Sequence, residues 1–255
     1  MDRATQVKLK FDRSRYHISS LSSEIGSYLA REPFAVHDAE DAQGDLVYRV
    51  TVREHPPIEL SLLLGDAIHN ARAALDYLAR QLVEAGGGAP NRDTAFPVAA
   101  SATAFADLCK KALKGALPAA ITGVESLHPY LGGDDRFWKL HKLDIADKHH
   151  LLLTVGAAHA SVNVSFGLPG GEEAIVLPLL PVNRAYPLQD GTEIFRVMKA
   201  ARESATQGVG GAHSFSFDVA FGDGVVVSGE PVMPTINNLV GGIEGAVAPL
   251  YQFIQ

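Results

Sequence analysis

The sequence is poor in the residues that build disulfide frameworks, zinc fingers and membrane spans. It has a single cysteine, Cys109, among 255 residues, which excludes an internal disulfide and a zinc site built from cysteines. No apolar run approaches the roughly 20 residues that a membrane-spanning helix needs. The opening MDRATQVKLKFDR is charged and has no apolar signal core. We therefore expect a soluble, cytoplasmic protein without a membrane partner.

Positive charge is also scarce. The net charge is −7 and the isoelectric point is near 5.8, whereas a general nucleic-acid binder needs a basic surface for phosphate contacts. Nucleic acid is therefore an improbable partner. The sequence also contains no P-loop, no G-x-S-x-G and no dinucleotide-binding G-x-G-x-x-G. Its hydrophobic fraction of 47% is ordinary for a globular protein with a sizeable core.

Apolar periodicity predicts long helices. The clearest covers residues 58–85, where Leu60, Leu64, Ala67 and Ala71 begin an apolar stripe with steps of three and four residues. Prolines precede this helix and the run GGGAP follows it, and both fit helix ends. The same reasoning predicts helices over residues 5–32, 136–153 and 235–254.

The helix expected over 136–153 differs from the others because its apolar residues lie almost all the way round. A helix of that kind is normally buried between other elements. We therefore expect it to be the most buried helix, with Trp138, Leu143, Ile145 and Leu152 in the core.

The sequence pattern becomes that of β-strands after residue 155. Residues 159–166 and 213–221 alternate strictly between apolar and polar side chains, as half-buried strands do. An earlier strand pair is expected near residues 34–37 and 46–53. The fold class is thus α+β, with a helical core and an antiparallel β-sheet from the C-terminal half. We expect a single domain, with a helical part at 1–155, a β-rich part at 156–232 and a C-terminal helix at 235–254.

Two of the expected helices carry polar stripes. On the 58–85 helix, Asp66, His69, Asp76 and Arg80 lie together, with Asn70 and Arg72 at the borders. On the 136–153 helix the stripe consists of His141, Asp144 and Lys148, with Asp147 beside it. A buried aspartate needs a partner. We therefore expect the two stripes to face each other across a cleft, within hydrogen-bond reach.

The same two stretches carry a family resemblance. GDAIHNARAALDYL at 65–78 and LHKLDIADKHHLLL at 140–153 resemble a family of uncharacterised bacterial proteins. That family has a G-D-x-x-H-N-x-R-x-A-L-D helix and a later L-D-x-x-D-K-H segment, and the similarity covers roughly residues 45–155. It implies no activity. It implies only that the polar motif positions are matched by Asp66, His69, Asn70, Arg72, Asp76, Asp144, Asp147, Lys148 and His149. Tyr77 and His150 depart from the pattern, which commonly has His and Arg there.

These residues favour a hydrolase that uses His/Asp acid–base chemistry. The candidate catalytic residues are Asp66, His69, Asp144 and Lys148. The candidate substrate-binding residues are Asn70, Arg72, Asp76, Asp147 and His149, and Lys148 and Arg72 are the expected anion-holding groups. His149 equally fits a packing role with a bond to a carbonyl. The spacings Asp66-x-x-His69 and His141-x-x-Asp144 would also suit a divalent metal between helices, so the cofactor stays open.

Other interpretations also remain open. The protein could be a non-enzymatic binder of a small molecule or a partner, and the first polar stripe could simply be the solvated face of an amphipathic helix. A HEPN-like ribonuclease, with its R-x4-6-H motif, is a third possibility. Arg136 and His141 have that spacing, whereas the match that begins at Arg72 ends in Tyr77 instead of histidine. The sequence does not specify the substrate or the oligomeric state.

Overall fold

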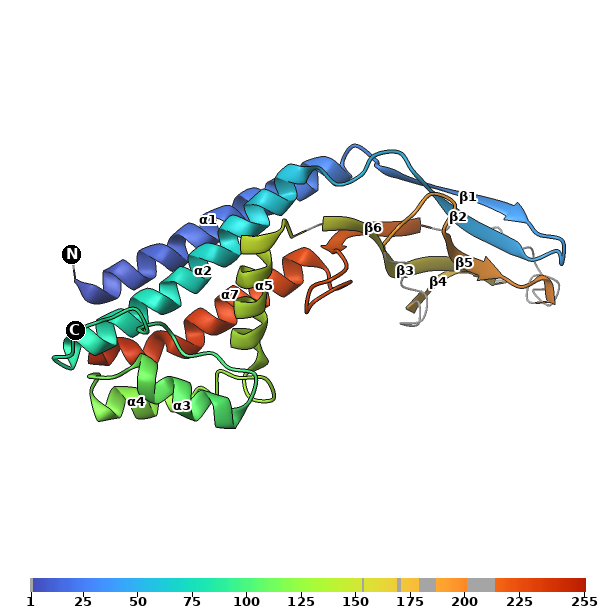
Figure 1. The fold of residues 1–255 in the computed structure, drawn as a ribbon. Coiled ribbons are helices and arrows are strands. Elements are labelled where there is room, and N and C mark those ends of the chain that lie inside the picture. Colours follow the sequence, from blue (N-terminus) through green and yellow to red (C-terminus); the bar gives the residue numbers. More distant parts are fainter. Residues whose placement is uncertain (1, 153, 169–170, 179–186, 201–213) are drawn as a thin grey trace.

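The computed structural model describes residues 2–152, 154–168, 171–178, 187–200 and 214–255. It confirms the α+β class: helices gather at one end of the molecule, and two small antiparallel sheets lie at the other (Figure 1). No helix in the described residues is long and apolar enough to cross a membrane. Stretches of the expected β-rich part, 156–232, lie outside the described residues, and the single-domain expectation stays a prediction.

Helices α1 (Arg3–Leu29) and α2 (Ile58–Ala85) run side by side as a long antiparallel pair (Figure 1). The helix expected at 5–32 starts earlier, because the Asp2 side chain caps it by accepting the N–H of Thr5 at 2.7 Å, and it also ends earlier, at Leu29. Helix α2 has the expected bounds. Between the two helices, the buried hydroxyl of Ser14 donates to the carbonyl of Ala67 at 2.7 Å.

Shorter helices and the C-terminal helix complete the helical end. They are α3 (Ala102–Ala112), α4 (Pro118–Glu125), α7 (Val232–Val247) and the 3-10 helix η2 (Ala248–Phe253). The helix expected at 235–254 therefore changes character part of the way along. Pro249 explains the change, because it has no N–H and its ring clashes with the preceding turn of an α-helix.

Helix α5 (Asp135–His149) corrects two expectations about the stretch 136–153. The helix ends at His149, where the extended backbone of His150 leads into the strand that begins at Thr154. It is also not the most buried helix, because α2 carries many more buried side chains. Leu143 and Leu152 are buried as expected, but Trp138 is only half-buried and Ile145 is 36% exposed.

The physical reason is that neighbouring elements cover only one side of α5. Its buried residues are Phe137, Leu140, Leu143 and Asp144, which recur at helical spacing on one face. That face packs against α2 and α7. The apolar residues on the opposite side have no comparable covering, so the all-round apolar pattern overstated the burial.

The strands form two three-stranded antiparallel sheets. One has the order β1 (Phe34–Glu40), β2 (Leu46–Val52), β5 (Glu193–Val197), and the other has β4 (Gly171–Pro178), β3 (Thr154–Leu168), β6 (Ser214–Phe221). Aromatic side chains join them, with ring centroids 4.9 Å apart for Phe34 and Phe217 and 5.5 Å apart for Tyr48 and Phe215. The sheets thus pack together beyond the ends of α1 and α2, away from most of the helical core (Figure 1).

Candidate functional site

The packing of α5 against α2 brings the two polar stripes together, as expected. His69 Nδ1 lies 3.1 Å from Asp144 Oδ1, and Lys148 Nζ donates to Asp144 Oδ2 at 2.6 Å. The Asp144 side chain is only 3% exposed, whereas His69 and Lys148 are 55% and 54% exposed. A buried carboxylate therefore holds two side chains that remain open to solvent.

This arrangement fixes the orientation of the imidazole. An ionised carboxylate only accepts hydrogen bonds, so the short contact to Asp144 places the proton of a neutral His69 ring on Nδ1. Nε2 is then the free acceptor, and no described side chain bonds it. The open edge of the ring can therefore accept a proton from a bound molecule or from water.

A notch in α2 receives Asp147. A Cβ atom at Gly65 would overlap the Asp147 carboxylate, so only glycine allows the carboxylate to lie this close to α2. Burial raises the pKa of Asp147, and the neighbouring carboxylates Asp144 and Asp66 raise it further. Gly65 is one helical turn from His69, which places Asp147 beside the imidazole. The sequence signal for this notch was a glycine in the middle of the strongest helix.

Helix α1 contributes a histidine that the sequence did not single out. His17 is buried, its Nδ1 lies 3.7 Å from Asp66 Oδ2, and that nitrogen has no hydrogen bond within the described structure. Burial lowers the pKa of His17, although the charge of Asp66 opposes the effect. Asp66 therefore faces His17, and the carboxylate that orients His69 is Asp144. Because His17 lies on the buried face of α1, its pattern resembles an ordinary core position.

Arg72 and Asp76 connect helix α2 to the backbone of Phe96. Arg72 Nη2 donates to the carbonyl of Phe96 at 3.0 Å and pairs with Asp76 Oδ1 at 2.9 Å. The same Asp76 oxygen accepts the N–H of Phe96 at 2.9 Å. Arg72 is only 7% exposed, so this pair ties the Phe96 segment to α2. Arg72 Nη1 is also buried and has no hydrogen bond within the described structure, and the expected role of Arg72 in holding an anion stays a prediction.

The remaining candidates lie at the edges of the site. The amide of Asn70 donates to the carbonyl of Asp66 in its own helix at 2.8 Å. His149 is exposed at the end of α5, which does not support the expectation that it packs. Substrate binding by either residue stays a prediction.

His141 lies deeper, against α2. Its Nδ1 is buried without a hydrogen bond, and burial, reinforced by the charge of Arg72, lowers its pKa to about 4. Within the described residues, no three His, Cys, Asp or Glu side chains are arranged to hold a metal ion. Of the two expected Asp/His pairs, His69 and Asp144 meet, but the four side chains do not form a metal-binding cluster. The HEPN-like spacing also has no structural support, since Arg136 pairs with Asp134 instead.

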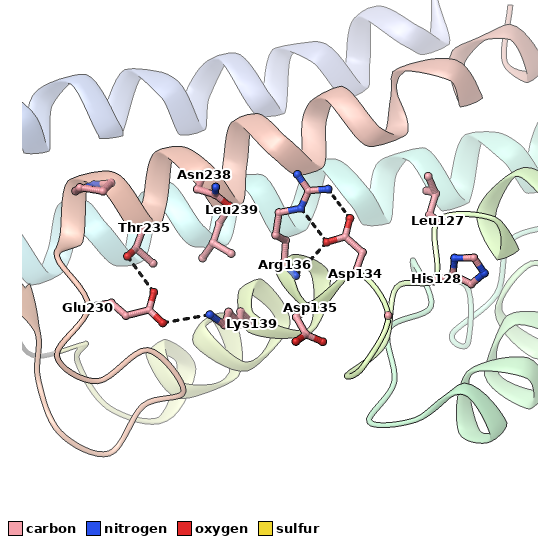
Figure 2. A pocket seen from close by; sticks show the side chains of 12 residues that line it. Leu127, His128, Asp134, Asp135, Arg136, Lys139, Glu230, Thr235, Asn238 and Leu239 are labelled. Carbon is pink, nitrogen blue, oxygen red and sulfur yellow. Dashed lines mark hydrogen bonds and ion pairs between the residues drawn. The ribbon is translucent and has the colours of Figure 1, made fainter. Parts of the chain in front are cut away.

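A pocket of about 830 Å³ lies elsewhere on the molecule, at the N-terminal end of α5 (Figure 2). It lies between the loop before α5, the first turns of α5 and the start of α7, and its polar side chains include Arg136, Lys139 and Glu230. Sequence reasoning missed it because Glu230 is about 90 residues from Lys139 in the chain.

No protein-family model, no curated protein and no solved structure matches the chain. The family resemblance therefore stays a prediction. The basis for a function is the geometry of the chain's own residues, above all the carboxylate–imidazole pair between α2 and α5.

Proposed function

We propose that the protein is a hydrolytic enzyme in which His69, oriented by Asp144, acts as a general base toward water. One observation carries the proposal: a buried carboxylate holds one nitrogen of a half-exposed imidazole at 3.1 Å. Histidine is the side chain best suited to exchange protons near neutral pH. A positioned general base typically contributes a factor of about 10²–10⁴ to the rate.

The proposed reaction uses water as the nucleophile. His69 Nε2 takes a proton from water as the oxygen attacks an electrophilic carbonyl or phosphoryl centre. The bond to the leaving group then breaks, and Asp147 gives the leaving group a proton. The raised pKa of Asp147 favours the protonated form that this role needs. The proton on His69 returns to Asp147 through solvent, which restores both groups.

Lys148 supplies the positive charge of the site. Its bond to Asp144 holds the ammonium group near the imidazole, and its partial exposure leaves hydrogens available to a ligand. In the proposed reaction it stabilises the negative charge that develops on the attacked group. Arg72 and Asp76 are not included, because their contacts to Phe96 give them a structural role.

The test is hydrolysis of p-nitrophenyl acetate and bis(p-nitrophenyl) phosphate by the full chain. We expect His69→Gln and Asp144→Asn to lower kcat/KM at least about 100-fold. The matched control is His55→Gln, since His55 is an exposed histidine just before α2, and it should keep full activity. Circular dichroism should show unchanged helix content in His69→Gln. A fully active His69→Gln protein would overturn the proposal.

The notch provides an independent test with a glycine control. Gly65→Ala places a methyl group where the Asp147 carboxylate lies, so it should displace that group and reduce activity. Gly26→Ala in α1 has nothing within 4 Å of its new Cβ atom. It should leave activity unchanged and stabilise the helix by about 0.5–1 kcal/mol. Equal activity of the two variants would remove Asp147 from the mechanism.

One observation favours the alternative of a non-enzymatic binding protein. The pocket at the N-terminal end of α5 has a volume of about 830 Å³, within the range of about 300–1,000 Å³ that small-molecule sites occupy. If no hydrolysis is found and a ligand binds there, this alternative becomes the better interpretation.

A further inference from the structure

The pocket at the N-terminal end of α5 is separate from the proposed hydrolytic site. Arg136 and Lys139 line it from the first turns of α5, whereas Asp144 and Lys148 lie near the other end of that helix. At 1.5 Å per residue, Arg136 and Asp144 are about 12 Å apart along the axis. An inference about this pocket therefore does not rest on the proposed hydrolysis.

Two ion pairs form opposite walls of the pocket (Figure 2). Arg136 binds Asp134 through two bonds, Nε to Oδ1 at 2.8 Å and Nη2 to Oδ2 at 2.6 Å. Lys139 Nζ donates to Glu230 Oε1 at 3.1 Å, and the Thr235 hydroxyl donates to Glu230 Oε2 at 3.1 Å. All these groups are partly exposed, so their polar atoms are held in place and still accessible.

The walls are also held by close backbone contacts. A Cβ atom at Gly133 would overlap the carbonyl of His128, and one at Gly242 would overlap the Arg136 guanidinium. His128 itself has φ 49°, in the left-handed region that non-glycine residues seldom adopt. Its carbonyl accepts the N–H groups of Tyr130 and Asp134, both at 2.8 Å. Backbone strain of this kind is often retained at binding sites.

The charges of the lining nearly cancel, which favours a neutral ligand. Three carboxylates, Asp134, Asp135 and Glu230, face two cations, Arg136 and Lys139, for a formal charge of −1. The N-termini of α5 and α7 also meet here, and each contributes about half a positive charge. The net charge of the side chains and the two helix ends together is close to zero. The charges of the pocket are thus nearly balanced, and its lining combines hydrogen-bonding side chains with apolar ones such as Leu127 and Pro234.

Several lining groups remain available to a ligand. The Asn238 amide is exposed, and no described group bonds it. The Asp135 carboxylate accepts only the N–H of Gly132, at 2.6 Å through Oδ1, so its Oδ2 is open within the described structure. The exposed His128 and Pro234 rings add apolar surface. Donors, acceptors and small apolar faces therefore alternate around the pocket.

We propose that this pocket binds a neutral, polyhydroxylated small molecule, namely a mono- or disaccharide. Each sugar hydroxyl both donates and accepts, so it can bind an acceptor such as the Asp135 carboxylate or the amide of Asn238, which donates and accepts. The C–H face of a sugar ring suits the exposed rings of His128 and Pro234. Because the side chains are open to water, we expect dissociation constants in the millimolar range, about −4 kcal/mol.

The test is saturation-transfer NMR of the full chain with D-glucose, D-galactose, D-mannose and N-acetylglucosamine, followed by titration of the best binder. Asn238→Ala and Asp135→Asn should each weaken its binding at least about fivefold. The matched control is Asn237→Ala. The Asn237 amide bonds its own helix at the carbonyl of Met233, and the residue does not line the pocket. This control should change binding less than about twofold.

Competition with charged probes tests whether the ligand is neutral. Acetate and spermidine should not compete with the bound sugar, because the positive and negative charges of the lining nearly cancel. Tighter binding of either probe than of every sugar would overturn the proposal. So would the absence of sugar binding up to about 100 mM, or an equal response of Asn238→Ala and Asn237→Ala. Sugar binding that persists in an inactive His69→Gln protein would separate this site from the hydrolytic one.

Discussion

Two polar pairs of α2, about one turn apart, have opposite environments. In the first, His69 is 55% exposed and is held by the buried Asp144 of α5. In the second, Arg72 is 7% exposed and its bonds go to Asp76 and the backbone of Phe96. The first pair thus leaves an imidazole open to solvent, while the second ties the Phe96 segment to α2. Polar residues of one motif therefore serve different purposes.

The difference comes from what covers each pair. The segment around Phe96 lies against Arg72 and Asp76: its carbonyl accepts from Arg72 and its N–H donates to Asp76. Helix α5 meets His69 through Asp144 and leaves more than half of the imidazole side chain uncovered. We call Arg72 and Asp76 the closed pair, and His69 and Asp144 the open pair. If this account is correct, substitutions in the closed pair should reduce stability, and substitutions in the open pair should reduce activity.

The largest effect should come from the face of α5 that supports the open pair. Leu143 is fully buried beside Asp144, so Leu143→Ala should lower the free energy of unfolding by about 2–5 kcal/mol. Ile145 is on the exposed side, and Ile145→Ala should cost less than about 1 kcal/mol. Urea unfolding of both variants measures the difference. Equal costs would show that the two faces of α5 are equally covered.

The next effect compares the two pairs directly. Arg72→Ala removes the ion pair with Asp76 and the donor to the carbonyl of Phe96. The cost should be about 2–3 kcal/mol, because Asp76 is partly exposed and keeps the N–H of Phe96. His69→Ala removes a half-exposed side chain and should change stability by no more than about 0.5 kcal/mol. Guanidinium unfolding at neutral pH tests this. A larger loss of unfolding free energy in His69→Ala than in Arg72→Ala would show that the pair of His69 and Asp144 has the structural role.

A pH effect of similar size should arise from His141, which lies among Arg72, Lys142, Asp144 and Lys148. Its pKa is lowered from 6.5 to about 4 in the folded chain. The unfolded chain therefore takes up the proton first as pH falls, and stability present above about pH 6.5 is lost toward pH 4. Between about pH 7 and pH 5 this amounts to about 2 kcal/mol.

His141→Gln removes the titrating group, so its unfolding free energy should fall less than that of the original chain over the same interval. Parallel denaturation series at the two pH values measure the difference. Identical pH slopes for the two proteins would contradict the lowered pKa of His141.

The smallest expected effect comes from Asp147, whose surroundings include Asp66, His69, Asp144 and His150. Its pKa is raised in the folded chain, so its contribution to stability is present below the usual aspartate pKa and is lost as pH rises through the folded-state value. Asp147→Asn should therefore be more stable than the original chain at neutral pH. The difference should shrink in acid, as thermal unfolding at several pH values can show. A destabilised variant at neutral pH would contradict the raised pKa.

Much of the fold was accessible from periodicity. The bounds of α2 were predicted residue for residue, because its apolar stripe is long and prolines and glycines mark its ends. The ends of the other helices were less certain, since they depend on local groups such as the Asp2 cap and Pro249. Burial of Ile145 was mispredicted because a sequence does not show how many neighbours a helix has.

The candidate site was predictable in its central contact and not in its surroundings. The spacing of His141, Asp144 and Lys148 placed a carboxylate opposite His69, and the structure has that contact. His17 and the notch at Gly65 depend on the close approach of α1 and α5 to α2. Such approaches are tertiary facts, and apolar periodicity does not encode them.

The most direct test of the central claim is the protonation of the His69 ring, measured by 15N NMR on histidine-labelled protein. With the ring neutral, the account predicts a proton on Nδ1, held by Asp144, and an unprotonated Nε2. Asp144→Asn should abolish this preference, and His69→Gln assigns the signals. A neutral ring protonated on Nε2, or a spectrum unchanged by Asp144→Asn, would contradict the claim that Asp144 orients His69 as a base.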